Sequence, residues 1–246
     1  MGFWIVAGLA AFILGLSKGG MPAMAILAVP LLSLYMDPIL AAGLLLPLYM
    51  IADCYAVYLF RKAFSRRNLM ILLPSSVFGI IGGYFAVSTV PTNAIKLLLA
   101  FIGFAYLANA IFKRLRKREG PPRPADVPRG VVFGALAGLT SYIAHAGGPP
   151  YQAYVLPQKL EKMAYLGTTT IFFTCVNIMK MPAFVLAGQL TWETLMQVLW
   201  LVPFALGGAW SGAQISRWLP QKVFFAFVEI ALGLVSFKLL SDVLLS

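Results

Sequence analysis

The chain has 246 residues, of which 61% are hydrophobic and only 11% are charged. Soluble domains carry about 45–50% apolar and about 25% charged residues, so this composition excludes a soluble domain. The net charge of +11 is not evidence of nucleic-acid binding, because the basic residues gather in short loops between long apolar runs. The composition therefore predicts an all-α polytopic membrane protein, with the excess of basic residues acting as a topology signal.

Taken in chain order, the sequence combines two interrupted apolar stretches with six continuous ones. The interrupted stretches are residues 3–35, broken at SKGGMP, and residues 130–157, broken at HAGGPP. The arms of the first stretch, about 14 residues each, reach only about 20 Å, short of the roughly 30 Å hydrocarbon core. We expect the arms of the second stretch to be shorter still. Each continuous run is a predicted spanning helix: residues 38–60, 69–90, 94–112, 163–187, 193–215 and 223–244.

The two interruptions belong to a tandem duplication. The GGMP of residues 19–22 corresponds to the GGPP of residues 147–150. Glycines and prolines of later helices recur in the same order, with Gly79, Gly83 and Pro91 repeated as Gly208, Gly212 and Pro220. We therefore predict one transmembrane domain over residues 1–246, with repeat one at 3–112, a cytoplasmic basic linker at 113–129 and repeat two at 130–244. Each repeat is a broken helical hairpin followed by three transmembrane helices.

The basic residues indicate how the repeats are related. Most of the 19 Lys and Arg residues lie in four loops, at 61–67, 113–129, 159–162 and 217–222. The positive-inside rule places all four loops on the cytoplasmic side. The loops that precede and follow residues 130–157 are then both cytoplasmic. Residues 130–157 must therefore enter the membrane and return, as a re-entrant hairpin or as a pair of helices that crosses the membrane twice. The repeats are inverted in this interpretation, and parallel repeats are the alternative.

The two breaks are the predicted binding site. Irregular backbone at membrane depth must be covered by protein or line a water-filled cavity, and paired Gly/Pro-interrupted segments are typical of the binding sites of secondary transporters. A proline near the first turn of each new helix, with free N–H groups at the positive dipole end, favours an anion. The predicted binding residues are the breaks and their charged neighbours: Lys18, Gly19, Gly20, Met21, Pro22, His145, Gly147, Gly148, Pro149 and Pro150.

Lys18 is the strongest single candidate. A lysine at the bilayer centre costs about 3 kcal/mol to insert, so it needs a partner. We expect that partner to be a substrate anion or Asp53, the nearest carboxylate in sequence. The alternative is a shallower Lys18 whose amine reaches the membrane interface. His145 has two interpretations, as an anion or proton ligand and as a satisfied core residue.

The secondary candidates are polar residues inside other apolar runs: Ser17, Asp53, Thr168, Thr169 and Lys180. For Thr168, Thr169 and the adjoining Thr170, hydrogen bonding back to helix carbonyls is the commoner alternative to lining a cavity. For Lys180, beside Pro182 near a helix end, we expect the amine to reach the interface. The glycines at positions 79, 82, 83, 207, 208 and 212 predict close helix packing.

Several segments around the breaks match a known pattern. They are the two Gly-Gly-x-Pro breaks with PAMAILAVPLL and PPYQAYVLP after them, GLLLPLYMIADCYAVYLFRK, and the paired turns GIIGGYFAVSTVP and GGAWSGAQISRWLP. Together they resemble the TauE/SafE family of sulfite exporters and related permeases over nearly the whole chain. The resemblance implies movement of sulfite, sulfoacetate or a similar anion across the bacterial inner membrane without ATP hydrolysis. Lys18 and the AHA of residues 144–146 depart from the glycine-richer family pattern.

These observations predict a secondary transporter that exports its substrate. The predicted substrate is a small sulfur-containing or organic anion, which binds between the two breaks and is exposed to each side of the membrane in turn by alternating access. An anion channel and a non-transporting scaffold subunit are the alternatives. An enzyme is not expected, because one histidine without a second ligand or a nucleophile–base pair offers no catalytic or metal site. The partners indicated are the anion and membrane lipid, with a coupling proton or ion as a further candidate and no nucleic acid or cofactor. The oligomeric state stays open, with a homodimer as one option.

Overall fold

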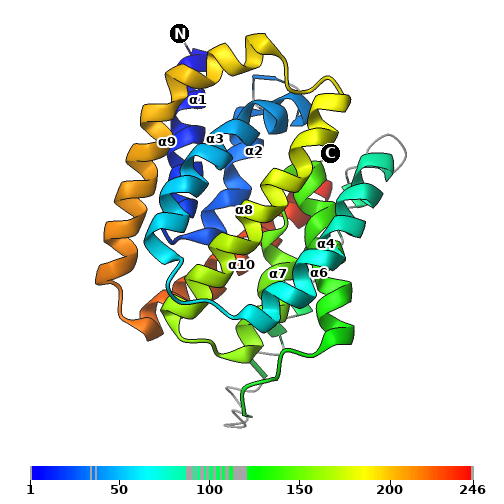
Figure 1. Cartoon of the computed structure of the whole chain (residues 1–246), viewed down its shortest axis with the longest axis vertical. Helices are drawn as coiled ribbons and strands as arrows, with labels where there is room; N and C mark the ends of the chain where they lie inside the picture. Colours follow the sequence, from blue (N-terminus) through cyan, green and yellow to red (C-terminus); the bar gives the residue numbers. More distant parts are fainter. Residues whose placement is uncertain are drawn as a thin grey trace.

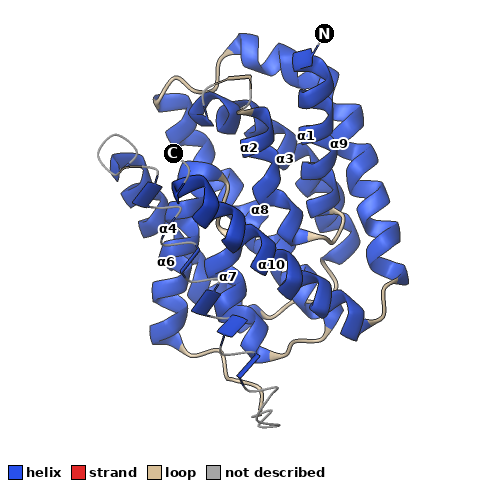
Figure 2. Ribbon diagram, turned by 180° about the vertical axis from the view of Figure 1, so that it is seen from behind, coloured by secondary structure: helices blue, strands red, loops and turns tan. Residues whose placement is uncertain are grey.

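The computed structural model describes residues 2–33, 35–36, 38–86 and 121–244, together with isolated positions between 91 and 112. Every regular element in these residues is a helix (Figure 2). The helices are α1 Gly2–Lys18, α2 Ala28–Leu32, α3 Pro38–Phe60, α4 Arg66–Ala86, α6 Val127–Ala144, α7 Gly148–Val155, α8 Lys162–Leu186, α9 Trp192–Trp218 and α10 Gln221–Leu244. Two 3₁₀ helices, η1 Pro22–Leu27 and η2 Leu156–Gln158, follow α1 and α7.

Six helices among the described residues are long and apolar enough to cross a membrane, namely α3, α4, α6, α8, α9 and α10. The prediction of a polytopic helical protein is therefore confirmed. Five of the six predicted spans correspond to helices. Nine of the 19 residues of the predicted helix at 94–112, and residues 113–120 of the linker, lie outside the described residues. The sixth long helix is α6, whose 18 residues reach about 27 Å at 1.5 Å per residue.

The expectation of short arms on both sides of the second break is thus wrong for its first arm. Only the return arm is short, since α7 has 8 residues and η2 adds 3. The sequence reasoning counted the first arm from residue 130, but α6 begins earlier because Asp126 caps it and accepts a 3.0 Å hydrogen bond from Arg129 N.

Helices from the two halves of the chain pack against each other. α1 lies along α9, and α6 lies along α4, on opposite sides of the bundle (Figure 1). The central helices α3 and α8 contact one another between these two pairs. The contacts of the two halves are therefore reciprocal: α1, the first helix of the first half, packs on α9 of the second half, and α6, the first helix of the second half, packs on α4 of the first half.

Four small-residue motifs allow these helices to approach closely. In each motif two glycines are separated by three residues, so both lie on one helix face. A Cβ atom at any of these positions would crowd atoms of the facing helix: Gly15, Gly19, Gly208 and Gly212 between α1 and α9, and Gly79, Gly83, Gly134 and Gly138 between α4 and α6. The prediction of close packing is wrong for Gly82 and Gly207, because the described part of the chain places nothing within 4 Å of a Cβ atom there.

Corresponding helices of the two halves run in opposite directions. In Figure 1, α3 runs from the upper to the lower end of the molecule and α8 runs upward. Likewise α4 runs upward and α9 downward. The loop between α3 and α4, the start of α6, the connection from η2 to α8 and the turn between α9 and α10 all lie at the lower end. The described parts of the four basic loops therefore share one end of the molecule.

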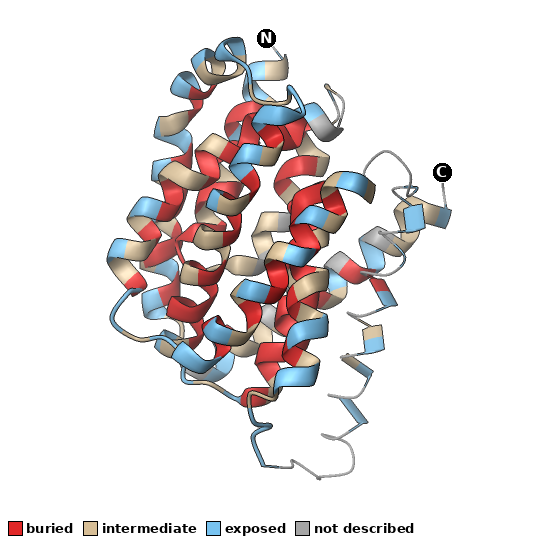
Figure 3. Cartoon of the chain, turned by 45° about the vertical axis from the view of Figure 1, so that its right-hand side comes forward, coloured by how far each residue is buried: buried red, intermediate tan, exposed pale blue. Residues whose placement is uncertain are grey.

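Apolar side chains cover the outer surface, while several polar side chains lie inside. Buried residues occupy the centre of the bundle in Figure 3, and the outward face of α9 carries the exposed side chains of Trp192, Trp200, Trp210 and Trp218. Trp192 and Trp218 stand at the two ends of this helix. Their separation of about 39 Å along the helix suits the two interfaces of a bilayer.

Candidate functional site

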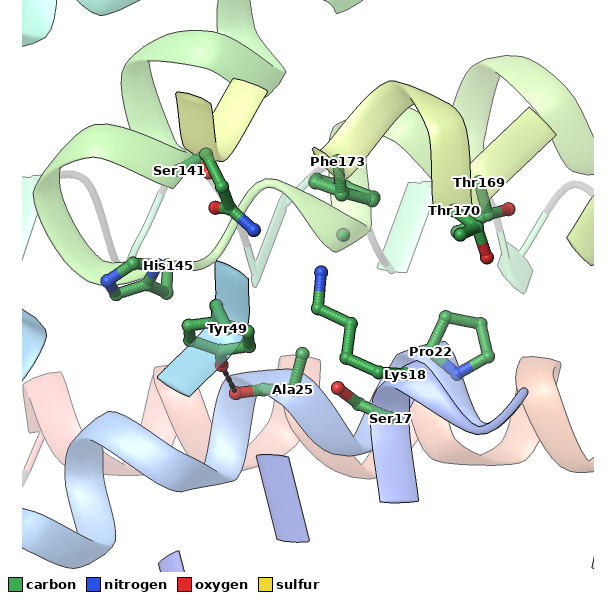
Figure 4. Close-up of a pocket in the computed structure, with 12 residues that line it drawn as sticks. Ser17, Lys18, Pro22, Ala25, Tyr49, Ser141, His145, Thr169, Thr170 and Phe173 are labelled. Atoms are coloured by element: carbon green, nitrogen blue, oxygen red, sulfur yellow. Dashed lines mark hydrogen bonds between the residues drawn. The ribbon is translucent and has the colours of Figure 1, made fainter. Parts of the chain in front are cut away.

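A cavity of about 50 Å³ lies where the two interrupted segments meet in the centre of the bundle (Figure 4). This is room for a few water molecules or a small ion, because about 10–15 Å³ of such volume holds one water. The first segment contributes Ser17, Lys18, Pro22 and Ala25, α3 contributes Tyr49, the second segment contributes Ser141, His145 and Gly148, and α8 contributes Thr169, Thr170, Phe173 and Asn177. Both breaks and both central helices therefore take part.

Lys18 enters this cavity as half of a buried ion pair. Its Nζ lies 2.6 Å from Oδ1 of Asp53, and the two side chains are 9% and 1% exposed. Asn177 on α8 donates a 2.7 Å hydrogen bond to the other carboxylate oxygen, Oδ2. The pairing of Lys18 with Asp53 expected from the sequence is present, and the alternative of a lysine reaching the membrane interface is wrong.

Aromatic rings also surround the Lys18 ammonium. Nζ lies 5.1 Å from the ring centroid of Tyr49 and 6.0 Å from that of Phe173. Rings at this distance attract a cation through their negative faces. The Tyr49 hydroxyl is turned away and donates a 3.0 Å hydrogen bond to Ala25 O in η1, which ties α3 to the segment after the first break (Figure 4).

Lys18 lies in the last turn of α1, not beside the start of the helix that follows. The helical hydrogen bonding continues one residue further, since Gly19 N donates to Gly15 O, and the chain turns at Gly20, whose φ is +115°. The negative end of the α1 dipole therefore faces the ammonium and favours it. The first break also leads into the 3₁₀ helix η1 rather than an α-helix, which corrects the predicted helix start at Pro22.

Lys180 is fully buried, so the prediction that its amine reaches the interface is wrong. Its Nζ lies 3.0 Å from Ser141 O, 3.1 Å from Ser141 Oγ and 2.9 Å from His145 Nδ1. Lys180 faces the end of α6, where the Ser141 and His145 acceptors replace water as partners of the amine. Lys180 thus lies directly behind two residues that line the cavity.

His145 holds a left-handed backbone conformation, with φ +49°, at the end of α6. Its ring stacks on Tyr49 at 4.7 Å between centroids, and Nε2 lies 3.0 Å from the Ala42 carbonyl oxygen. A carbonyl only accepts, so Nε2 carries the proton and Nδ1 is free to accept from Lys180. The geometry therefore describes a neutral imidazole with a defined tautomer.

The predicted threonines divide between two roles. Thr169 and Thr170 line the cavity, whereas Thr168 contacts the loop before α4, where its Oγ1 accepts a 2.8 Å hydrogen bond from Ser65 N. Thr168 and Thr169 each also donate to a carbonyl one turn earlier, Ala164 O and Tyr165 O. Thr169 therefore does both: it hydrogen-bonds back to its own helix and lines the cavity.

The break glycines mostly serve helix packing. A Cβ at Gly19 would collide with the backbone of Ala209 and Gly212 on α9, and one at Gly147 would crowd Ala137 O. Gly20 adjoins Ser216, whose hydroxyl donates a 3.2 Å hydrogen bond to Gly19 O. Of the four break glycines, Gly148 lines the cavity. Three other predicted residues, Met21, Pro149 and Pro150, are placed in the breaks but outside the cavity lining.

Sequence reasoning missed five residues of the cavity lining: Ala25, Tyr49, Ser141, Phe173 and Asn177. Asn177 and Ser141 carry a signal that was available, because each is a polar side chain within an apolar run and polar residues inside membrane helices mark functional sites. Phe173 carries no such signal, since phenylalanine is ordinary on a spanning helix.

Comparisons with known proteins identify the family of the chain. Searches of curated proteins and of solved structures each find no match. The family model described as sulfite exporter TauE/SafE matches residues 5–239, which includes both breaks, the lysines and all six long helices up to the last turns of α10. The chain therefore belongs to the TauE/SafE family of membrane transporters.

Proposed function

We propose that this protein is a secondary transporter of the bacterial inner membrane that exports a small sulfur-containing or organic anion, such as sulfite or a sulfonate. The family is described as sulfite exporters, which supports the substrate class. The observation that carries the proposal is the charge of the site. Among the described residues, two buried lysines, Lys18 and Lys180, act on the cavity region together with a single carboxylate, Asp53.

The proposed binding step is an exchange of partners at Lys18. In the resting state Asp53 neutralises the ammonium at 2.6 Å. An incoming anion takes the place of that carboxylate, and Asp53 keeps its hydrogen bond from Asn177. Desolvated charged groups are costly when unpaired. A site that always offers Lys18 one anion or the other avoids an unpaired cation in both states, whereas Asp53 keeps only the Asn177 hydrogen bond while the substrate is bound. This exchange also gives Asp53 the means to expel the substrate.

The proposed alternating access relies on two inverted repeats. Opposite directions of α3 and α8, and of α4 and α9, support inversion, as do the reciprocal contacts of α1 with α9 and of α6 with α4. In transporters built this way, one repeat rocks against the other around a site near the bilayer midplane. The cavity between the two breaks is such a site, because each half of the chain supplies part of its wall.

Binding of the anion is tested by thermal unfolding of the purified protein with sulfite, sulfate, thiosulfate, methanesulfonate and acetate. A ligand at 100 times its dissociation constant stabilises the folded state by about 2.7 kcal/mol. We expect a rise in unfolding temperature with sulfite or methanesulfonate, and none with sodium chloride at matched ionic strength. Equal shifts with all salts, chloride included, would contradict a specific site.

Asp53→Asn is expected to tighten anion binding and slow turnover. The amide keeps the size of the side chain and contact with Asn177, but it no longer competes for Lys18. One charge-assisted contact is worth about 1.5–3 kcal/mol, so the dissociation constant should fall roughly tenfold or more. Titration of the binding signal and uptake into proteoliposomes measure the two effects. Unchanged affinity with unchanged transport would show that Asp53 does not compete with the substrate.

The inverted arrangement requires both chain ends to face the periplasm, because the described parts of the four basic loops lie at the lower end of the molecule in Figure 1, away from the N-terminus, and basic loops face the cytoplasm. A fluorescent protein that matures only in the cytoplasm, fused after Ser246, should stay dark, and a periplasmic alkaline phosphatase fusion at the same place should be active. Fusions inserted after Lys159 serve as the control and should give the reverse result. A bright C-terminal fluorescent fusion would favour parallel repeats.

A further inference from the structure

The lysine behind the cavity, Lys180, differs from Lys18 in having no carboxylate partner among the residues that the structure describes. Lys180 is fully buried and contacts three neutral acceptors, two on Ser141 and one on His145. The charged groups that act on it are Lys18 of α1 and Asp53 of α3, and Asp53 is already paired with Lys18. A further titratable group against this cluster, within the described part of the chain, is Tyr49 of α3, which stacks on the imidazole. A charged Lys180 therefore leaves the site with an excess positive charge.

The hydrogen bonds around Lys180 suit both of its protonation states. An ammonium donates three hydrogen bonds, to Ser141 O, Ser141 Oγ and His145 Nδ1. A neutral amine donates two, to Ser141 O and His145 Nδ1, and accepts the third from the Ser141 hydroxyl, which both donates and accepts. The imidazole cannot reverse in the same way, because Nε2 must donate to Ala42 O. Rotation of one hydroxyl therefore lets a proton arrive or leave with every hydrogen bond kept.

Ser141 also connects the amine to the cavity. The hydroxyl that contacts Lys180 belongs to a residue of the cavity wall, and so does His145. Water in the cavity can thus exchange a proton with Lys180 through Ser141 while the lysine itself stays outside the lining. A buried amine with no such contact would have no path for its proton.

We propose that Lys180, Ser141 and His145 form a proton site that is loaded together with the transported anion. The inference rests on the proposed anion transport. A proton from cavity water binds the lone pair of Lys180 Nζ, the amine becomes an ammonium, and the Ser141 hydroxyl turns from donor to acceptor. The bound anion supplies the negative charge that the ammonium needs. On release to the other side the anion leaves, and the proton returns to water, so a monovalent anion crosses with no net charge.

The test uses the full-length protein in liposomes with a trapped pH dye, valinomycin and equal potassium on both sides to hold the membrane potential at zero. Radiolabelled methanesulfonate is the probe, because it carries no proton of its own near neutral pH. We expect an inward methanesulfonate gradient to acidify the lumen in step with anion uptake. In Lys180→Met the number of protons that enter per methanesulfonate taken up should fall towards zero, whatever rate of methanesulfonate exchange between equal pools remains. Lys238→Met, at an exposed lysine paired with Asp242 on α10, is the matched control and should behave as wild type.

A second pair of variants separates a proton role from a structural one. Ser141→Ala removes the rotating hydroxyl, so the pH at which net uptake is half-maximal should shift, and Ser141→Thr should restore it. Wild-type uptake of methanesulfonate without acidification would overturn the proton site and leave the proposed function intact. Acidification that persists in Lys180→Met would also overturn it. A wild-type protein that neither binds nor exchanges methanesulfonate would overturn the proposed sulfonate transport, and the proton site with it.

Discussion

Lys18→Met is expected to weaken anion binding by roughly ten- to a hundred-fold and, on its own, to destabilise the protein. The binding loss is the value of one charge-assisted contact, about 1.5–3 kcal/mol. The stability loss arises because Asp53, 1% exposed, is left with Asn177 as its remaining partner. Breaking a buried pair by removing one member costs about 3–5 kcal/mol. Lys18→Arg should retain part of the affinity, since the charge survives while the donor geometry changes.

The double variant Lys18→Met with Asp53→Asn distinguishes these two effects. Removing both charges leaves no unpaired carboxylate, so the unfolding temperature should recover towards wild type while anion transport stays lost. Thermal unfolding and methanesulfonate binding are measured on the wild type, the two single variants and the double variant. If the two side chains form an ion pair, the stability change of the double variant differs from the sum of the two single changes. If Lys18→Met binds its anion at wild-type affinity, the lysine is not the counter-charge, and the backbone of the breaks binds the anion alone.

Leucine at Gly79 or Gly208 is expected to prevent the bundle from assembling. A Cβ at Gly79 would overlap the Ala135 carbonyl on α6, and one at Gly208 would overlap the Phe12 carbonyl on α1. Overpacking a core costs about 1–3 kcal/mol when side chains can yield, and more when they cannot. Here the obstacle is backbone, so the helices themselves must separate. We expect little monodisperse protein from either variant by size-exclusion chromatography in detergent.

Leucine at Gly82 and Gly207 provides the matched controls. These glycines lie three residues after Gly79 and one before Gly208, on the same helices. No atom of the described residues lies within 4 Å of a Cβ at either position. Leucine favours the helix over glycine by up to about 1 kcal/mol, so both controls should fold with unchanged or higher unfolding temperature. Loss of folding in a control as severe as in its partner would show that helix crossing does not depend on these contacts.

The different behaviour of neighbouring glycines shows where sequence reasoning reaches its limit. Gly79, Gly82 and Gly83 were equivalent candidates for close packing, but the face that α4 turns towards α6 includes Gly79 and Gly83 and excludes Gly82. Likewise Lys18 and Lys180 were both lysines in apolar runs, and the structure buries both. The pairing of Lys18 with Asp53 could be predicted, since a membrane lysine needs a counter-charge and few acids are available. The neutral partners of Lys180 could not, because hydroxyl and imidazole acceptors carry no charge that would identify them in advance.

The sequence by itself determined that this protein is a polytopic helical membrane protein with two broken segments, and that Lys18 belongs to one of them. Those properties are local. The length of each apolar run determines which segments can cross the membrane, and glycine and proline determine where a helix is interrupted. Only the tertiary structure decided that Asn177 holds Asp53, 124 residues away, and that Lys180 meets Ser141 and His145 across the bundle. Such contacts depend on how helices rotate and cross, and that is set by the summed packing of many side chains, which no single stretch of the chain contains.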